Sequence, residues 1–179
     1  MKKNLIIALF CCINALSFAQ LETLDLKNVV VVALLDKADE RFTLEVNLSE
    51  ILANQGIKTM ASLNALKQGT DIKVIGSDSI ISALKAKGFD TYVLVSVRGY
   101  DTKFKKATIF NDLKTELGIG HAFPLYRDAI VSITLDFNFY RDGKHVAYDL
   151  YRFSGTSSRD QVIKKIRKKL PKRIIKNWI

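Results

Sequence analysis

Residues 28–35 read NVVVVALL, and this stretch decides the fold of the chain. After Asn28 it has no polar residue, and β-branched side chains dominate it, so neither of its faces is suited to water. Such a run is typical of a strand that is covered on both sides, usually a parallel strand at the centre of a sheet. We therefore expect a buried central strand here.

A helix and a second strand follow this run. The helical pattern after Asp36–Glu40 ends at Gly56, which suits the left-handed conformation that closes a helix. Its apolar positions fall on or near one face, namely Phe42, Leu44, Leu48, Ile51 and Leu52. Residues 57–61 then form a short strand, which completes a right-handed βαβ unit.

The middle of the chain predicts one further helix and one further strand. Residues 63–76 are ambiguous, and 71–75 are compatible with a brief strand. Ser77 or Asp78 caps a second helix that ends at Gly88. Residues 90–97 (DTYVLVSV) then predict a third strand of the sheet.

A long antiparallel hairpin is predicted after residue 130. Residues 130–140 alternate strictly, with Val131, Ile133, Leu135, Phe137 and Phe139 on one face, and Asp142-Gly143 is a strong two-residue turn signal. With that turn, Phe139 opposes Val146, Phe137 opposes Tyr148 and Leu135 opposes Leu150. The same register places Asp136 opposite Asp149, which is unfavourable because like charges repel.

The chain ends in a basic amphipathic helix. Ser157 or Ser158 caps it, and Pro171 interrupts it or starts a second segment. Its apolar residues recur every three or four positions, at Val162, Ile163, Ile166, Leu170, Ile174 and Trp178. The order β-α-β-α-β-β-β-α predicts a single-domain α/β sandwich with a mixed sheet, spanning residues 20–179.

Residues 1–19 predict a cleaved bacterial signal peptide. Lys2 and Lys3 precede an apolar run of roughly a dozen residues, and Ser17-Phe18-Ala19 forms a cleavage site. The run is too short for a membrane anchor, since a bilayer span needs ~20 apolar residues. Cys11 and Cys12 lie within it and do not fit a lipidation site. We expect an exported protein, periplasmic or extracellular, that is not an integral membrane protein.

The positive charge is concentrated at the end of the chain. The formal net charge is +10, and residues 159–176 carry nine basic side chains against one acid. The segment forms either an ordinary solvated helix face or a surface for anionic lipid or polymer, through Lys164, Lys165, Lys168 and Lys169. No recognition motif accompanies the charge, so we do not expect nucleic acid as a partner.

The pattern of core and cap residues resembles small α/β domains of the cell envelope. The positions that carry the resemblance are Val29–Leu35, Arg41, Phe42, Leu48, Leu52, Gly56, Ile57, Gly88, Phe89, Asp90 and Val93–Val95. At these positions the chain resembles the TolB amino-terminal domain, the lipoprotein activators of penicillin-binding proteins and the curli-secretion lipoproteins. The resemblance implies a non-catalytic accessory that binds other proteins. Membrane attachment does not carry over, because the chain lacks the lipidated cysteine.

Two regions are candidates for binding or chemistry. The segment 101–128 is a long connecting loop, or includes a short helix at residues 112–117 that docks on the core. It offers basic and aromatic side chains that suit a partner: Lys103, Phe104, Lys105, Lys106, Phe123 and Tyr126. The acidic strand edge around Asp36, Arg41 and Asp101 is the second region, as open α/β sheets bind ligands at this edge.

No pattern specifies a metal or a cofactor. His121 and His145 lack the spacing of a metal motif, and no glycine-rich phosphate loop or serine nucleophile motif is present. The sequence favours an exported, non-catalytic envelope binding module with no cofactor, whose partner is a protein, an anionic polymer or a lipid surface. The alternative is a small periplasmic enzyme or ligand-binding domain that uses the acidic edge, with Arg98 and His121 converging on it.

Overall fold

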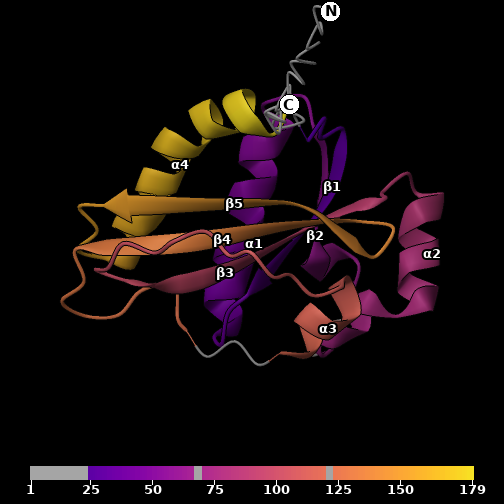
Figure 1. Ribbon diagram of the computed structural model, residues 1–179, viewed down its shortest axis with the longest axis horizontal. Helices are drawn as coiled ribbons and strands as arrows, with labels where there is room; N and C mark the ends of the chain where they lie inside the picture. The colour runs from indigo at the N-terminus through magenta and orange to yellow at the C-terminus, as the bar shows by residue number, and fades with distance from the viewer. Residues whose placement is uncertain (1–23, 67–69, 120–122) are drawn as a thin grey trace, which may run out of the picture.

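Five strands form one mixed sheet within the residues that the computed structural model describes, which are 24–66, 70–119 and 123–179 (Figure 1). The predicted signal peptide and His121 lie outside these residues. The elements are β1 (Asn28–Leu34), α1 (Ala38–Ala53), β2 (Lys58–Ala61), η1 (Ser62–Asn64), η2 (Ile72–Gly76), α2 (Asp78–Ala86), β3 (Thr91–Tyr100), α3 (Leu113–Gly118), β4 (Ser132–Arg141), β5 (Lys144–Ser154) and α4 (Arg159–Asn177). The predicted α/β sandwich with a mixed sheet is confirmed.

The strand order is β2-β1-β3-β4-β5, so β1 lies inside the sheet as its sequence indicates. β1 runs parallel to both of its neighbours, and β3, β4 and β5 are antiparallel in turn. Val29 to Ala33 are completely buried, which confirms the strand covered on both faces. Gly56 adopts φ +80° after α1, where a side chain would be strained.

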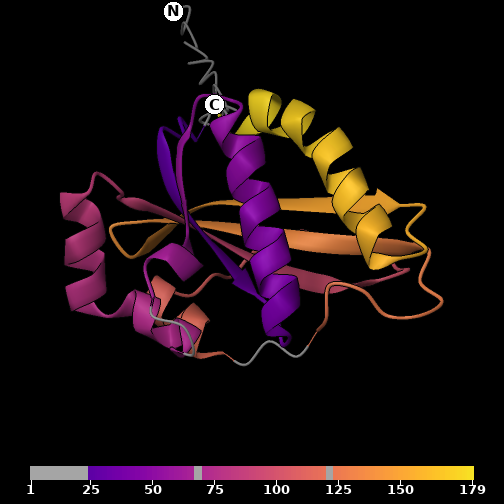
Figure 2. The same ribbon diagram turned by 180° about the vertical axis from the view of Figure 1, so that it is seen from behind.

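One face of the sheet, which we call the closed face, is covered by α1 and α4 (Figure 2). Alternate residues of the strands pack there, including Val31, Val95 and Phe137, and all are shielded from water. Trp178 at the end of α4 packs its ring against Phe137, with ring centroids 5.1 Å apart. On this face the strand residues are apolar from Val93 to Val97 on β3 and from Ile133 to Phe139 on β4.

The opposite face of the sheet is divided into two halves. Over β1 and the start of β3, apolar residues such as Val32 and Leu94 pack under α2 and α3, where Leu84 and Leu117 are buried. Beyond them the same face carries Ser96, Arg98, Asp136, Asn138 and Tyr148. We call these five residues the polar half-face. In Figure 1 this half lies behind the irregular segment 101–112, which covers it in place of a helix among the described residues.

The predicted hairpin register is wrong by one residue beyond the turn. Phe139 pairs with Ala147 and Phe137 with Asp149, because a β-bulge at Val146 adds one residue to β5. The shift places Asp149 toward α4 on the closed face, where it accepts hydrogen bonds from Arg173 Nε (2.8 Å) and Trp178 Nε1 (2.9 Å). The predicted repulsion between Asp136 and Asp149 is thereby avoided.

Four smaller predictions are also wrong. Phe42 is 59 % exposed on α1 rather than part of its apolar face, and Val131 lies exposed before β4 begins. Residues 72–75 fall in the 3-10 helix η2 rather than a strand, and Asp71 caps it by accepting from Lys73 N. Pro171 does not divide the last helix, since α4 continues through it to Asn177.

Candidate functional site

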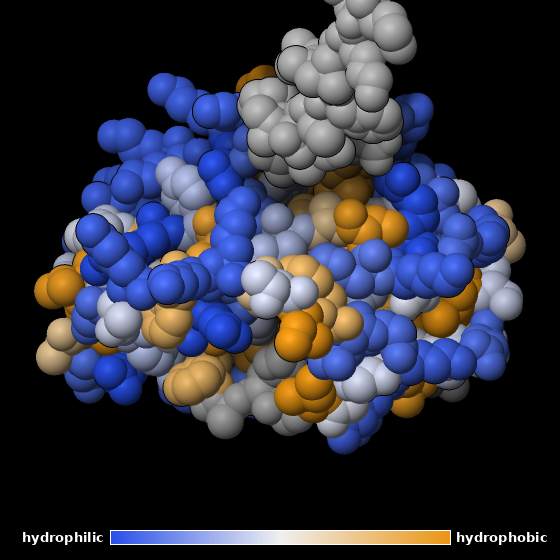
Figure 3. Space-filling model, in the orientation of Figure 1, coloured by the Kyte–Doolittle hydropathy of each residue, from blue (hydrophilic) through white to orange (hydrophobic). Residues whose placement is uncertain are grey.

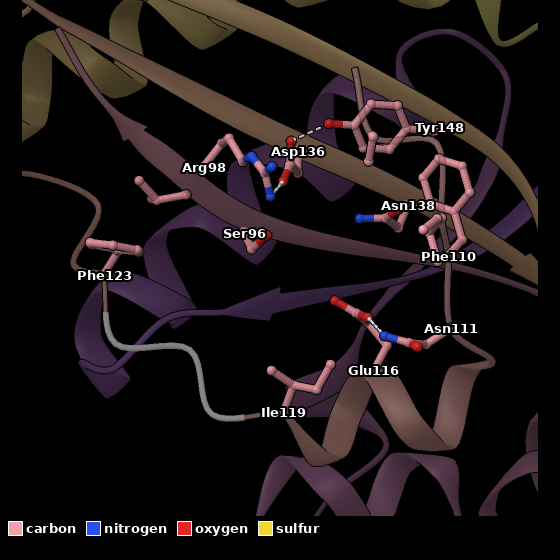
Figure 4. Close-up of a pocket in the computed structure, with 13 residues that line it drawn as sticks. Ser96, Arg98, Phe110, Asn111, Glu116, Ile119, Phe123, Asp136, Asn138 and Tyr148 are labelled. Carbon is pink, nitrogen blue, oxygen red and sulfur yellow. Dashed lines mark hydrogen bonds and ion pairs between the residues drawn. The ribbon is translucent and has the colours of Figure 1, made fainter. Parts of the chain in front are cut away.

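The floor of the candidate site is the polar half-face. Ser96 and Arg98 come from β3, Asp136 and Asn138 from β4, and Tyr148 from β5, so side chains from three strands point to one side (Figure 4). Ser96, Asp136 and Asn138 are less than a tenth exposed, although they are polar. Burying polar groups is costly unless they are hydrogen-bonded, so this floor is not explained by packing alone.

The segment 101–112 crosses this floor and is held at three points. The ring of Phe104 lies over Gly99, where an added Cβ would come 2.5 Å from Phe104 Cζ. The backbone of Ala107 lies beside the Tyr148 hydroxyl. Phe110 stacks on His145, with ring centroids 3.9 Å apart and planes 6° apart. The segment is thus fixed although it contains no helix or strand.

Between the segment and the floor lies a cavity of about 430 Å³, within the range of small-ligand sites. Its walls include Phe110, Asn111 and Glu116. Its rim carries three large apolar side chains that face water: Ile109 (87 % exposed), Ile119 and Phe123. In Figure 3, which views this face, hydrophobic residues gather around a hollow below the centre.

The polar groups of the cavity are arranged around Asp136. Tyr148 donates a hydrogen bond of 2.6 Å to Asp136 Oδ1, and Arg98 Nη1 lies 4.0 Å from Asp136 Oδ2. Burial, together with the hydrogen bond to Asp136, raises the pKa of the Tyr148 hydroxyl above its ordinary value. The hydroxyl therefore remains protonated and serves as a donor at neutral pH. On the opposite wall, Asn111 Nδ2 donates to Glu116 Oε2 at 3.0 Å.

This arrangement offers donors and acceptors side by side. The long Arg98–Asp136 distance and the exposure of nearly half of the Arg98 side chain leave the guanidinium able to turn toward a ligand. The cavity can therefore hold a polar group while the apolar rim contacts whatever carries that group.

The predicted residues of the segment 101–128 occupy different positions. Phe123 lines the cavity, whereas the ring of Phe104 packs over Gly99. Tyr126 donates from its hydroxyl to Ser157 O at 2.9 Å. The remaining members face solvent: Lys103, Lys105 and Lys106. Leu113 and Leu117 of α3 are buried, so the docked short helix that the sequence allowed is present.

At the acidic strand edge, Asp101 is engaged in holding the fold. Asp101 Oδ1 accepts from the backbone N–H of Val131 and Ser132, at 2.9 and 2.8 Å, and these bonds lower the pKa of Asp101. Asp36 is exposed, and Arg41 is half-buried on α1.

Asp36, Arg41 and Asp101 do not line the cavity. His121 lies outside the described residues. Among the described residues, Arg98 is therefore the one member of the predicted enzymatic set that the structure places at the cavity. The described residues contain no group of three metal-ligating side chains. In the same part of the chain, no helix is both long and apolar enough to cross a membrane.

The predicted anionic-surface lysines lie on α4. Lys164 and Lys168 are exposed, and Lys165 and Lys169 are half-buried. Lys168 and Lys169 line a second, open groove together with Tyr151, Lys172, Arg173 and Lys176. Lys165 points toward Gly155 instead, where its Nζ would lie 3.1 Å from an added Cβ.

The polar floor was missed by sequence reasoning, although a signal for it exists. In DTYVLVSVR the apolar run of β3 turns polar at Ser96 and Arg98, on the face where β4 carries Asp136 and Asn138. Reading the two strands together predicts a polar surface on one half of the sheet.

Comparison with known proteins shows a similarity in fold and no similarity in sequence to a known family. No protein-family model and no curated protein matches the sequence. The structure is similar to lipoprotein GNA1162 from Neisseria meningitidis, with 11% identity, a TM-score of 0.44, and coverage of 84% of this chain and 99% of that one. It is also similar to PelC from Paraburkholderia phytofirmans, solved as a dodecamer, with 11% identity, a TM-score of 0.43, and coverage of 83% and 88%. At these values the likeness supports no argument about function.

Proposed function

We propose that this chain is an exported, non-catalytic binding module of the cell envelope and that it holds a protein partner at the cavity over the polar half-face. A polar side chain of the partner enters the cavity, and apolar groups beside it cover the rim. The observation that supports this most is the combination of a buried polar floor with an exposed apolar rim.

The rim argues for a macromolecule rather than a small free ligand. Ile109 is 87 % exposed and Phe123 about half exposed, and a molecule confined to the cavity would leave much of both in water. Clusters of exposed apolar side chains are typical of protein interaction sites. The floor adds selectivity, because a partner that desolvates the Arg98 guanidinium without accepting a hydrogen bond from it is penalised.

The test compares partner capture by two triple variants of the exported protein. The rim variant I109S/I119S/F123S should lose most of the envelope protein that wild type retains. The control F42S/V46S/V74S removes three exposed apolar side chains elsewhere and should retain it. Equal capture by both variants, at wild-type level, would overturn the proposal. Thermal unfolding checks that both variants are folded.

A further inference from the structure

The basic side chains of α4 divide into two groups with different surroundings. Each of its arginines binds a carboxylate of the domain. The pairs are Arg159 with Asp39 (2.6 Å), Arg167 with Glu50 (2.7 Å), and Arg173 with Asp149 (2.5 Å). These three cations attach α4 to α1 and to β5, and their charge is compensated within the fold.

The lysines of the second half of α4 are not compensated in this way. Within the described residues, Lys168, Lys169, Lys172 and Lys176 form no ion pair with a carboxylate. All four line the open groove of about 390 Å³ beside Tyr151. Their charges therefore add up over a small area, where they attract an anionic partner.

Two exposed isoleucines lie among these lysines. Residues three and four apart are neighbours on a helix, so Lys168, Lys172, Ile175 and Lys176 share one surface, and Ile179 follows just beyond the end of the helix. We call these five residues the outer face of α4. It lies opposite the buried stripe of Ile166, Leu170 and Ile174. Ile175 is 61 % exposed, and Ile179 is also exposed. A surface that combines lysines with exposed aliphatic side chains is typical of helices that lie on membranes.

We propose that the outer face of α4 docks on an anionic phospholipid membrane, with its lysines on the lipid phosphates and Ile175 and Ile179 in the acyl boundary. A soluble polyanion would satisfy the lysines but would give the isoleucines no apolar environment.

The test is co-sedimentation of the exported protein with vesicles of phosphatidylcholine containing about a third phosphatidylglycerol, at low salt. Wild type should bind these vesicles, should not bind pure phosphatidylcholine, and should be released as salt screens the charges. The variant K168E/K172E/K176E should bind at least ~100-fold more weakly, because each lysine near an anionic surface contributes roughly a fivefold factor. The variant I175S/I179S should bind several-fold more weakly.

Matched controls separate this surface from general effects of charge and hydrophobicity. K73E/K87E/K144E makes the same charge change at exposed lysines far from α4, and V46S/V74S removes two exposed valines. Both should bind as wild type does, and all variants should show wild-type thermal unfolding. The proposal is overturned if wild type does not bind, if K73E/K87E/K144E loses as much binding as K168E/K172E/K176E, or if I175S/I179S binds normally while dextran sulfate alone competes.

Discussion

The two sides of β3 and β4 show how one pair of strands serves two purposes. On the closed face Val95, Val97 and Phe137 are buried in an apolar core under helices. On the other side of the same strands, Ser96, Arg98 and Asp136 lie under an irregular segment with a cavity beneath it. A helix needs an apolar surface to pack on, and this half-face does not provide one. The contrast fits the proposal that the closed face provides stability and that the polar half-face binds a partner.

The largest expected effect is on the closed face. Val31→Asp places a carboxylate among completely buried side chains, and burying an unpaired charge costs several kcal/mol, of the order of the whole stability of a domain. We expect a protein that is largely unfolded by circular dichroism. The control Val46→Asp, at an exposed position on α1, should unfold close to wild type. A Val31→Asp protein as stable as wild type would show that β1 is not the core strand.

The next effect concerns the carboxylate that joins α4 to the closed face. Asp149→Ala removes the acceptor of Arg173 and of Trp178 Nε1, and breaking a buried ion pair typically costs about 3 kcal/mol. Urea unfolding measures the loss. Glu50→Ala breaks the exposed pair with Arg167 and should change stability little. Similar losses from the two substitutions would show that α4 is not anchored mainly through Asp149.

A smaller effect is expected where the segment 101–112 meets the sheet. Gly99→Ala brings a Cβ within 2.5 Å of Phe104 Cζ, so the ring must move, and we expect a loss of about 1–2 kcal/mol. Hydrogen exchange of residues 103–110 should become faster, while the exchange of β1 is unchanged. Gly118→Ala, which meets no atom within 4 Å, is the control. Unchanged exchange in 103–110 would mean that Phe104 does not hold the segment.

The smallest effect is a pH dependence that arises at Glu45, a buried carboxylate of α1. It accepts from Ala33 N (2.9 Å) and from the Ser62 hydroxyl (2.7 Å), and burial raises its pKa above the ordinary value of 4.5. The folded state therefore keeps this proton to a higher pH than the unfolded state does. Its contribution to stability is greatest below pH 4.5 and is lost as the pH rises through the raised pKa.

The glutamine of Glu45→Gln cannot ionise. Between pH 4 and pH 7, wild type should therefore lose unfolding free energy relative to the variant. Urea unfolding at several pH values measures this difference. Parallel profiles for the two proteins would show that Glu45 titrates alike in both states. Other carboxylates contribute equally to both profiles and cancel.

The sequence predicts the fold well where the signal is local. The run 28–35 specifies a strand buried on both faces, and Asp142-Gly143 specifies the turn between β4 and β5. The predicted register of the β4–β5 hairpin is wrong because the bulge at Val146 cannot be recognised from the alternation of β4. Pro171 was misjudged for a similar reason: packing of Leu170 and Ile174 on the closed face holds α4 together across a residue that disfavours a helix.

The site was predicted poorly because it depends on contacts between distant segments. Phe123 was identified from composition, but nothing in the sequence near Phe104 shows that its ring is needed at Gly99. The sequence suggested that Asp101 is available for chemistry, but in the structure its Oδ1 accepts a hydrogen bond from the backbone N–H of Val131. Local patterns give residue types, whereas the pairing of β3 with β4 decides which polar groups share a surface.

Site-specific photo-crosslinking tests the central claim most directly, namely that the cavity over the polar half-face is where the partner binds. A photoreactive phenylalanine analogue is placed at Ile109 or Phe123 on the rim, and at Phe42 on α1 as the exposed control. The account predicts the same discrete crosslinked species from positions 109 and 123 in intact cells, and its absence from position 42. Crosslinking of that species from position 42 with equal yield, or no crosslinking from either rim position, would contradict it.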